Sequence, residues 1–91
     1  MGEISIERKF HASVLLVGHH LRNRAESTDL EEQLAFALEN RMFREQDVAF
    51  FRRCLELDEK LQQGSADEEI GEELVKELQA CAMRLNAVEA A

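Results

Sequence analysis

Proline is absent from this chain of 91 residues, and only four glycines are present. Because these two residues are the strongest helix breakers, the chain has few places where a helix must stop. Tryptophan and tyrosine are also absent, so phenylalanine supplies all the aromatic side chains. The composition is 45% hydrophobic and 33% charged, which is too apolar for a disordered chain. These features favour a folded helical domain with a strongly charged surface.

The two cysteines and three histidines lack the spacing of a metal site. Cys54 and Cys81 have no second cysteine or histidine at ligand spacing. Both lie on apolar stripes, which favours small buried thiols in a reducing cytoplasm; a disulfide between them is the alternative. His11, His19 and His20 point in different directions around a helix. The sequence therefore predicts no metal and no cofactor.

Long apolar runs are absent as well. A membrane-spanning helix needs about 18 apolar residues, and no run approaches that length. The apolar block at residues 12–18 is short for a signal peptide and follows Glu3 and Glu7. We therefore expect a cytoplasmic protein that does not bind membranes.

The charge is acidic overall and uneven along the chain. The formal net charge is -8, with a net of +2 over residues 1–24 and -10 over residues 25–91. Such a surface repels the phosphates of nucleic acids and anionic lipids. It would favour a basic protein partner, or it simply keeps the protein soluble.

Local signals place several helix ends. Gly64 is expected to end one helix, and Ser65 with Glu68 forms a capping box that begins the next. Thr28 with Glu31 marks another helix start, reinforced by the acidic residues around it.

Apolar periodicity suggests where the middle of the chain breaks. A stripe that begins at Leu30 fails near residue 40, and a displaced stripe begins at Val48. We therefore expect a break between residues 40 and 47, with Asp47 as a candidate N-cap. One unbroken helix over 29–63 is the alternative.

The two ends of the chain also show helical spacing. The last helix carries a seam at intervals of four and three residues, formed by Leu74, Leu78, Cys81, Leu85 and Val88. Near the amino end, the apolar run Val14–Val17 covers all sides of a helix. That helix is either central in the bundle or presents one face to a partner. Gly18 would allow a neighbouring backbone to approach closely.

These patterns together predict an all-α fold, with one helical domain over 1–91. We expect a small antiparallel bundle of three to four helices, at about 5–25, 29–43, 47–63 and 66–88. Because a domain of this size has a thin stability margin, a homodimer is expected.

Catalytic motifs are missing. The chain has no Gly-rich phosphate loop, no GxSxG motif and no cysteine beside a histidine. Arg52 and Arg53 follow two phenylalanines but are surrounded by acidic residues, which argues against binding to nucleic acid.

The leading hypothesis is a non-catalytic protein–protein interaction module: an adaptor, a chaperone-like protein or a small regulator that binds through exposed apolar helix faces. The candidate contact residues for a partner or a second copy are Phe10, Val14, Leu15, Val17, Leu21, Phe43, Phe50 and Phe51. One alternative is an acidic mimic of nucleic acid that inhibits a basic protein. The other is a small all-helical enzyme with a polar pocket at Arg8, Arg22 or Arg24.

Overall fold

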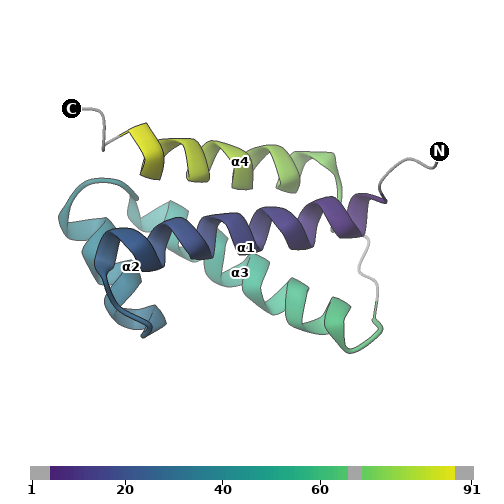
Figure 1. The fold of residues 1–91 in the computed structure, drawn as a ribbon. Helices are drawn as coiled ribbons and strands as arrows, with labels where there is room; N and C mark the ends of the chain where they lie inside the picture. Colours follow the sequence, from purple (N-terminus) through teal and green to yellow (C-terminus); the bar gives the residue numbers. More distant parts are fainter. Residues whose placement is uncertain (1–4, 66–68, 88–91) are drawn as a thin grey trace.

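Helix α1 spans Ile6–Ala25 and contacts all three other helices in the computed structural model, which describes residues 5–65 and 69–87 (Figure 1). The hydroxyl of Ser5 caps its start and accepts a hydrogen bond from the Arg8 backbone N–H at 3.3 Å. Glu26 ends the helix in the left-handed conformation, with a φ of 53°. The predicted helix over 5–25 is confirmed.

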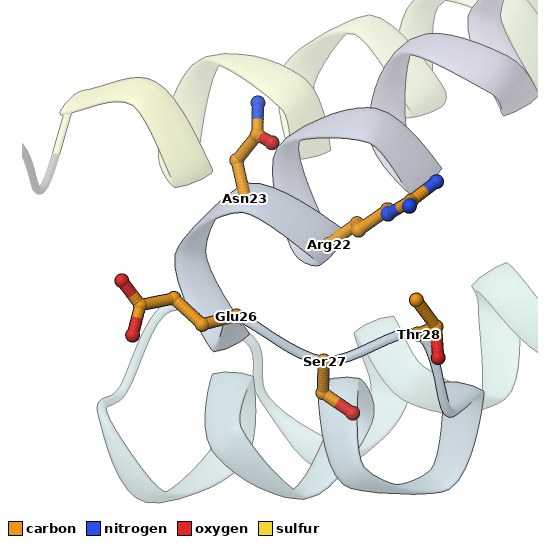
Figure 2. A pocket seen from close by; sticks show the side chains of 5 residues that line it. All are labelled: Arg22, Asn23, Glu26, Ser27 and Thr28. Atoms are coloured by element: carbon orange, nitrogen blue, oxygen red, sulfur yellow. The ribbon is translucent and has the colours of Figure 1, made fainter.

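Helix α2 spans Leu30–Glu39 and follows the turn drawn in Figure 2. Its N-cap is Asp29 rather than Thr28, because the Asp29 carboxylate accepts the hydrogen bond from the Glu32 N–H. The helix ends earlier than the predicted residue 43. Arg41 takes a left-handed φ of 58°, a conformation that glycine usually adopts. The backbone N–H groups of Met42 and Phe43 then donate to the Ala37 carbonyl and end the helix.

Helix α3 spans Glu45–Gln62, so the expected break is confirmed and the unbroken helix over 29–63 is wrong. The N-cap is Arg44, and the prediction that Asp47 occupies this position is wrong. Asp47 is instead the third helical residue, and its carboxylate accepts the Arg44 N–H at 2.8 Å. At the other end Gly64 terminates the helix as predicted, with a φ of 92°.

Helix α4 spans Glu72–Ala87, six residues later than its predicted start at 66. Residues 69–71 are described and are not helical. Glu68 of the predicted capping box and Val88 of the predicted seam lie outside the described residues. Within the seam, Leu78, Cys81 and Leu85 are fully buried, whereas Leu74 is partly buried.

The helices form a bundle in which α1 and α4 lie side by side and run in the same direction, with α3 antiparallel to both (Figure 1). The short helix α2 lies at one end of this arrangement. The all-α prediction is confirmed, and no strand occurs in residues 5–65 and 69–87. The three long helices α1, α3 and α4 alternate in direction along the chain, and the short helix α2 joins α1 to α3 (Figure 1).

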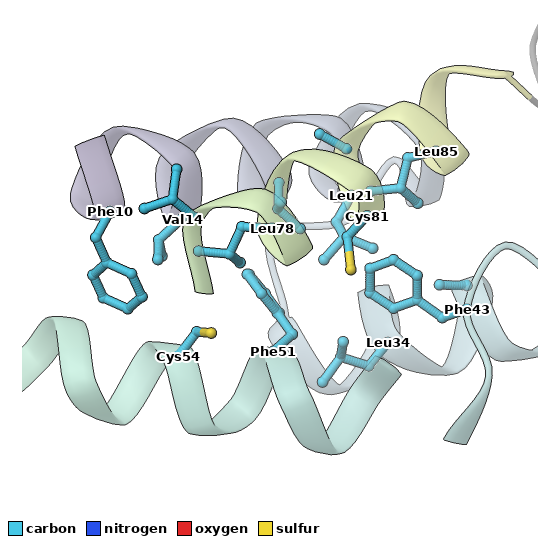
Figure 3. Close-up of a cluster of buried hydrophobic side chains, with 14 of the residues drawn as sticks. Phe10, Val14, Leu21, Leu34, Phe43, Phe51, Cys54, Leu78, Cys81 and Leu85 are labelled. Carbon is cyan, nitrogen blue, oxygen red and sulfur yellow. The ribbon is translucent and has the colours of Figure 1, made fainter. Parts of the chain in front are cut away.

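One cluster of buried apolar side chains fills the space between the helices (Figure 3). The inner face of α1 contributes Phe10, Val14, Val17 and Leu21. The other helices contribute Phe51, Cys54 and Leu57 from α3, and Val75, Leu78, Cys81, Ala82 and Leu85 from α4. Because α1 has one face committed to this core, its opposite face is the part left for solvent or a partner.

Candidate functional site

The outer face of α1 is a solvent-facing strip with two adjacent leucines at its centre. Leu15 is 58% exposed and Leu16 is 43% exposed. The strip, called here the outer face of α1, consists of Arg8, Lys9, Ala12, Leu15, Leu16, His19, Arg22 and Asn23. Large exposed apolar side chains that are contiguous and flanked by polar residues are typical of interaction surfaces.

The outer face of α1 is basic, although the chain as a whole is acidic. None of its residues carries a carboxylate. The ammonium group of Lys9 lies 3.8 Å from the Glu72 carboxylate, a weak contact because both side chains are exposed. Within the described part of the chain, Arg8 and Arg22 have no carboxylate partner. This face therefore offers two uncommitted guanidinium groups around a leucine centre.

An open groove of about 660 Å³ lies beside this face, between α1, α2 and α3. Its apolar lining comes from Val14, Leu15, Gly18, Leu30, Phe51 and Leu55, and its polar lining from His19, Arg22, Gln33 and Asp58. A side chain added at Gly18 would meet no atom within 4 Å. The expected close approach of a neighbouring backbone at Gly18 is therefore wrong, and the missing side chain leaves space in the groove.

Hydrogen bonds hold two of the polar residues of the groove, Asp58 and Gln33. His11 Nδ1 lies 2.7 Å from the Asp58 carboxylate, which joins α1 to α3. The amide of Gln33 donates to the carbonyl of Ser27 at 2.7 Å, so Gln33 is held by the turn before α2. Since Asp58 of α3 and Gln33 of α2 are held in this way, part of the polar lining of the groove is fixed before a partner binds.

A second hollow lies at the turn between α1 and α2, lined by Arg22, Asn23, Glu26, Ser27 and Thr28 (Figure 2). Its lining is mostly polar. The hydroxyl of Ser27 is already hydrogen-bonded at the start of α2. The Ser27 hydroxyl donates to Glu32 at 3.1 Å and accepts the N–H of Asp29 at 3.1 Å. Both hydrogen bonds of this hydroxyl serve the start of α2, and its carboxylate neighbour, Glu32, is exposed.

Most of the predicted contact residues lie inside the chain rather than on its surface. Six of the eight are buried: Phe10, Val14, Val17, Leu21, Phe43 and Phe51. Phe50 is half-buried, and only Leu15 is largely exposed. The six buried residues contact other helices of the same chain, so a partner cannot reach most of the predicted surface directly. Leu16 and Leu55 were not among the predicted contact residues. Which side of each helix faces the core depends on how the helices pack, and the sequence pattern alone does not determine it.

The arginines of α3 act in ion pairs between elements. Arg52 binds the Glu31 carboxylate of α2 at 2.7 Å, and Arg53 binds Glu69 at 2.8 Å. Because these guanidinium groups already hold carboxylates, they are poorly placed to grip nucleic acid phosphates. In the part of the chain that the structure describes, no cluster of three or more histidine, cysteine or acidic residues could hold a metal ion.

Asp47 is the buried charged group among the residues that the structure describes, with only 4% of the residue exposed. Burial alone would raise its pKa, but hydrogen bonds from Arg44 and the nearby Arg84 guanidinium, 2.8 Å away, lower the pKa to about 2. Because Arg84 belongs to α4, this carboxylate ties the start of α3 to the last helix.

The two thiols are free and buried, so the structure contains no disulfide between them. Burial raises the pKa of Cys54 to about 12 and that of Cys81 to about 11. A thiol with such a pKa is almost wholly protonated at neutral pH and is a poor nucleophile. Neither cysteine is therefore suited to redox or nucleophilic chemistry in the folded chain.

Both thiols should consequently resist modification until the chain unfolds. At pH 8, Ellman's reagent is expected to label them at least about 100-fold more slowly in the native protein than in guanidinium chloride, because labelling requires opening of the core. Native-state labelling at the rate of an unfolded cysteine would contradict the buried positions.

Comparisons with known proteins give no relative for this arrangement. No family model matches the chain, and neither a curated protein nor a solved structure is detectably similar to it. Among the described residues, no helix combines the length and the apolar character needed to cross a membrane. The function must therefore be argued from the geometry itself.

Proposed function

We propose that this chain is a non-catalytic protein-binding module whose partner docks on the outer face of α1. The observation that carries the proposal is the exposure of two adjacent leucines, of which Leu15 lines the open groove and Leu16 lies beside it on α1. Covering two such leucines removes apolar surface from water, which is the main favourable term in most protein association. The groove then supplies the concave apolar site that an anchoring side chain of the partner needs.

The geometry suits a helical segment of the partner. The groove runs alongside a straight helix of 20 residues, α1, and is walled by Leu55 and Phe51 of α3 on its other side. A partner helix that presents apolar residues at spacings of three and four could place them against Leu15 and above Gly18. The shape of the site therefore favours a helix lying in the groove over a flat contact.

The outer face of α1 is poorly suited to self-association. If two copies paired their α1 helices antiparallel about Leu15, Arg8 of one copy would face Arg22 of the other. Like charges placed opposite each other oppose such pairing. We therefore propose that the chain is monomeric before it meets its partner, in place of the homodimer expected from its size.

The other two functions have weaker support. Acidic mimicry of nucleic acid requires free carboxylates, whereas several acids between residues 56 and 77 already have a partner in the chain. Glu56 and Glu69 pair with Arg53, and Asp58 is hydrogen-bonded to His11. An enzyme would use the polar hollow at Arg22, where the only hydroxyl with a carboxylate neighbour, Ser27, is occupied by helix capping.

Removing the two exposed leucines should abolish binding without unfolding the domain. The double change Leu15→Gln/Leu16→Gln keeps helix propensity and changes stability by about 1 kcal/mol or less, because both side chains are exposed. Affinity capture from the cells that produce the protein should recover a partner with the parent chain and lose it with this variant.

The matched control is Leu38→Gln/Met83→Gln, which removes two exposed apolar side chains from α2 and α4. This control should capture the same partner as the parent chain. If the α1 variant still captures it, or if the control loses it equally, the outer face of α1 is not the binding surface.

A further inference from the structure

We infer that the partner of this chain presents an acidic amphipathic helix to the outer face of α1. This inference rests on the proposed function and specifies the chemistry of the partner. It reverses the expectation from net charge, because an acidic chain would ordinarily favour a basic partner.

The arginines of the chain carry the argument. Arg44, Arg52, Arg53 and Arg84 each lie within 3.3 Å of a carboxylate oxygen of the same chain. Arg8 and Arg22 lie in the same acidic protein, yet neither has a carboxylate partner within residues 5–65 and 69–87. Carboxylates supplied by another molecule would complete this face.

The positions of the two arginines set the length of the partner segment. Arg8 and Arg22 are separated by fourteen residues of one helix, which corresponds to roughly 21 Å along its axis. The leucine pair lies midway between them. A partner helix of about five turns would therefore reach both arginines with acidic residues near its ends and cover the leucines with apolar residues near its middle.

The residues that line the groove indicate where an acidic residue of the partner helix should lie. Arg22 and His19 line it together with Gly18 and Leu55, so an apolar side chain above Gly18 would lie within a helical turn of Arg22. The acidic group in the groove, Asp58, is already paired with His11. An acidic residue of the partner is thus favoured at the Arg22 end.

A second copy of the chain is a poorer occupant. Two outer faces of α1 repel each other, because Arg8 of one copy would face Arg22 of the other. The acidic surface of α3 or α4 from another copy could approach α1, but such a contact joins two different surfaces and leaves both ends open for further copies. A separate acidic helix satisfies the charges without that consequence.

The experiment uses two synthetic helical peptides of about 18 residues, each spanning roughly 27 Å. Both carry the same leucine stripe at spacings of three and four, and they differ only in having glutamate or lysine at the flanking positions. Binding to the parent chain is measured by fluorescence anisotropy at low salt. We expect the glutamate peptide to bind at least about tenfold more tightly than the lysine peptide, and its binding to weaken as salt rises.

Charge reversal of the two arginines provides the decisive comparison. In Arg8→Glu/Arg22→Glu the preference should switch to the lysine peptide. Lys60→Glu/Lys76→Glu changes the net charge by the same amount at exposed positions on α3 and α4, and it should keep the preference of the parent chain. Circular dichroism confirms that each variant remains helical.

Several outcomes would overturn the inference. Equal or tighter binding of the lysine peptide, or no binding of the glutamate peptide up to about 1 mM, would exclude an acidic helix. Sedimentation showing a dimer that Leu15→Gln/Leu16→Gln dissociates would make a second copy the occupant. If partner capture still depends on the two leucines in any of these cases, the proposed function stands and only the partner chemistry is wrong.

Discussion

Replacing Phe51 with alanine is expected to lower the free energy of unfolding by about 3–5 kcal/mol, a large share of the stability of a small domain. Phe51 is 1% exposed and projects from α3 toward α1 and α4 in the core (Figure 3). Its removal would leave a cavity that this small interior can close only in part. Urea unfolding followed by circular dichroism measures the loss.

The neighbouring phenylalanine is the matched control for this change. Phe50 is half-buried and packs at the edge of the core, so Phe50→Ala should cost roughly 1–2 kcal/mol. If the two variants lose the same stability, or if Phe50→Ala loses more, the orientation of α3 against the core is wrong.

Replacing Asp47 with asparagine is expected to cost about 2 kcal/mol at neutral pH. The carboxylate completes the start of α3 and lies 2.8 Å from the Arg84 guanidinium. Asparagine keeps the size of the side chain but removes the charge, which leaves Arg84 with a weaker partner. Because two helices meet at this group, the loss should appear in global unfolding and not only in fraying of α3.

The pH dependence of the same group has a definite sign. The pKa of Asp47 in the folded chain is about 2, below its ordinary value of 3.8. A carboxylate with a lowered pKa stabilises the fold fully above the ordinary value, and that contribution disappears as the pH falls toward 2. The stability difference between the parent chain and Asp47→Asn should therefore be constant above pH 5 and shrink between about pH 4 and pH 2.

Glu59→Gln is the control for general acid effects, because Glu59 is exposed on the same helix. Its stability should follow that of the parent chain across the whole range. A difference for Asp47→Asn that persists unchanged at pH 2 would show that the buried charge is not the cause.

Much of the fold follows from local features of the sequence. Gly64 predicts the end of α3 because only glycine adopts its positive φ without strain, and the shift of the apolar stripe predicts the break before α3. The end of α2 was missed by several residues because Arg41 takes the left-handed position there. Nothing in the type of that residue indicates such a conformation.

The candidate site was predicted only in part. The run Val14–Val17 predicted that α1 is either central or presents one face to a partner; α1 contacts all three other helices, and the partner contact stays a proposal. Periodicity could not decide which of the adjacent leucines or phenylalanines faces inward, because that depends on how α3 and α4 lie on α1. The pair of Asp47 and Arg84, which are far apart in the sequence, could likewise be recognised only after the chain was folded.

The assignment of the outer face of α1 as the binding surface is tested most directly by methyl NMR of leucine and valine side chains. The spectrum is recorded while the glutamate peptide is added to the parent chain. The largest shift changes should fall on Leu15 and Leu16, with smaller ones on Leu55, while the exposed Leu38 should be unaffected. Changes centred on Leu38, or peptide binding that leaves Leu15 and Leu16 unchanged, would contradict the assignment.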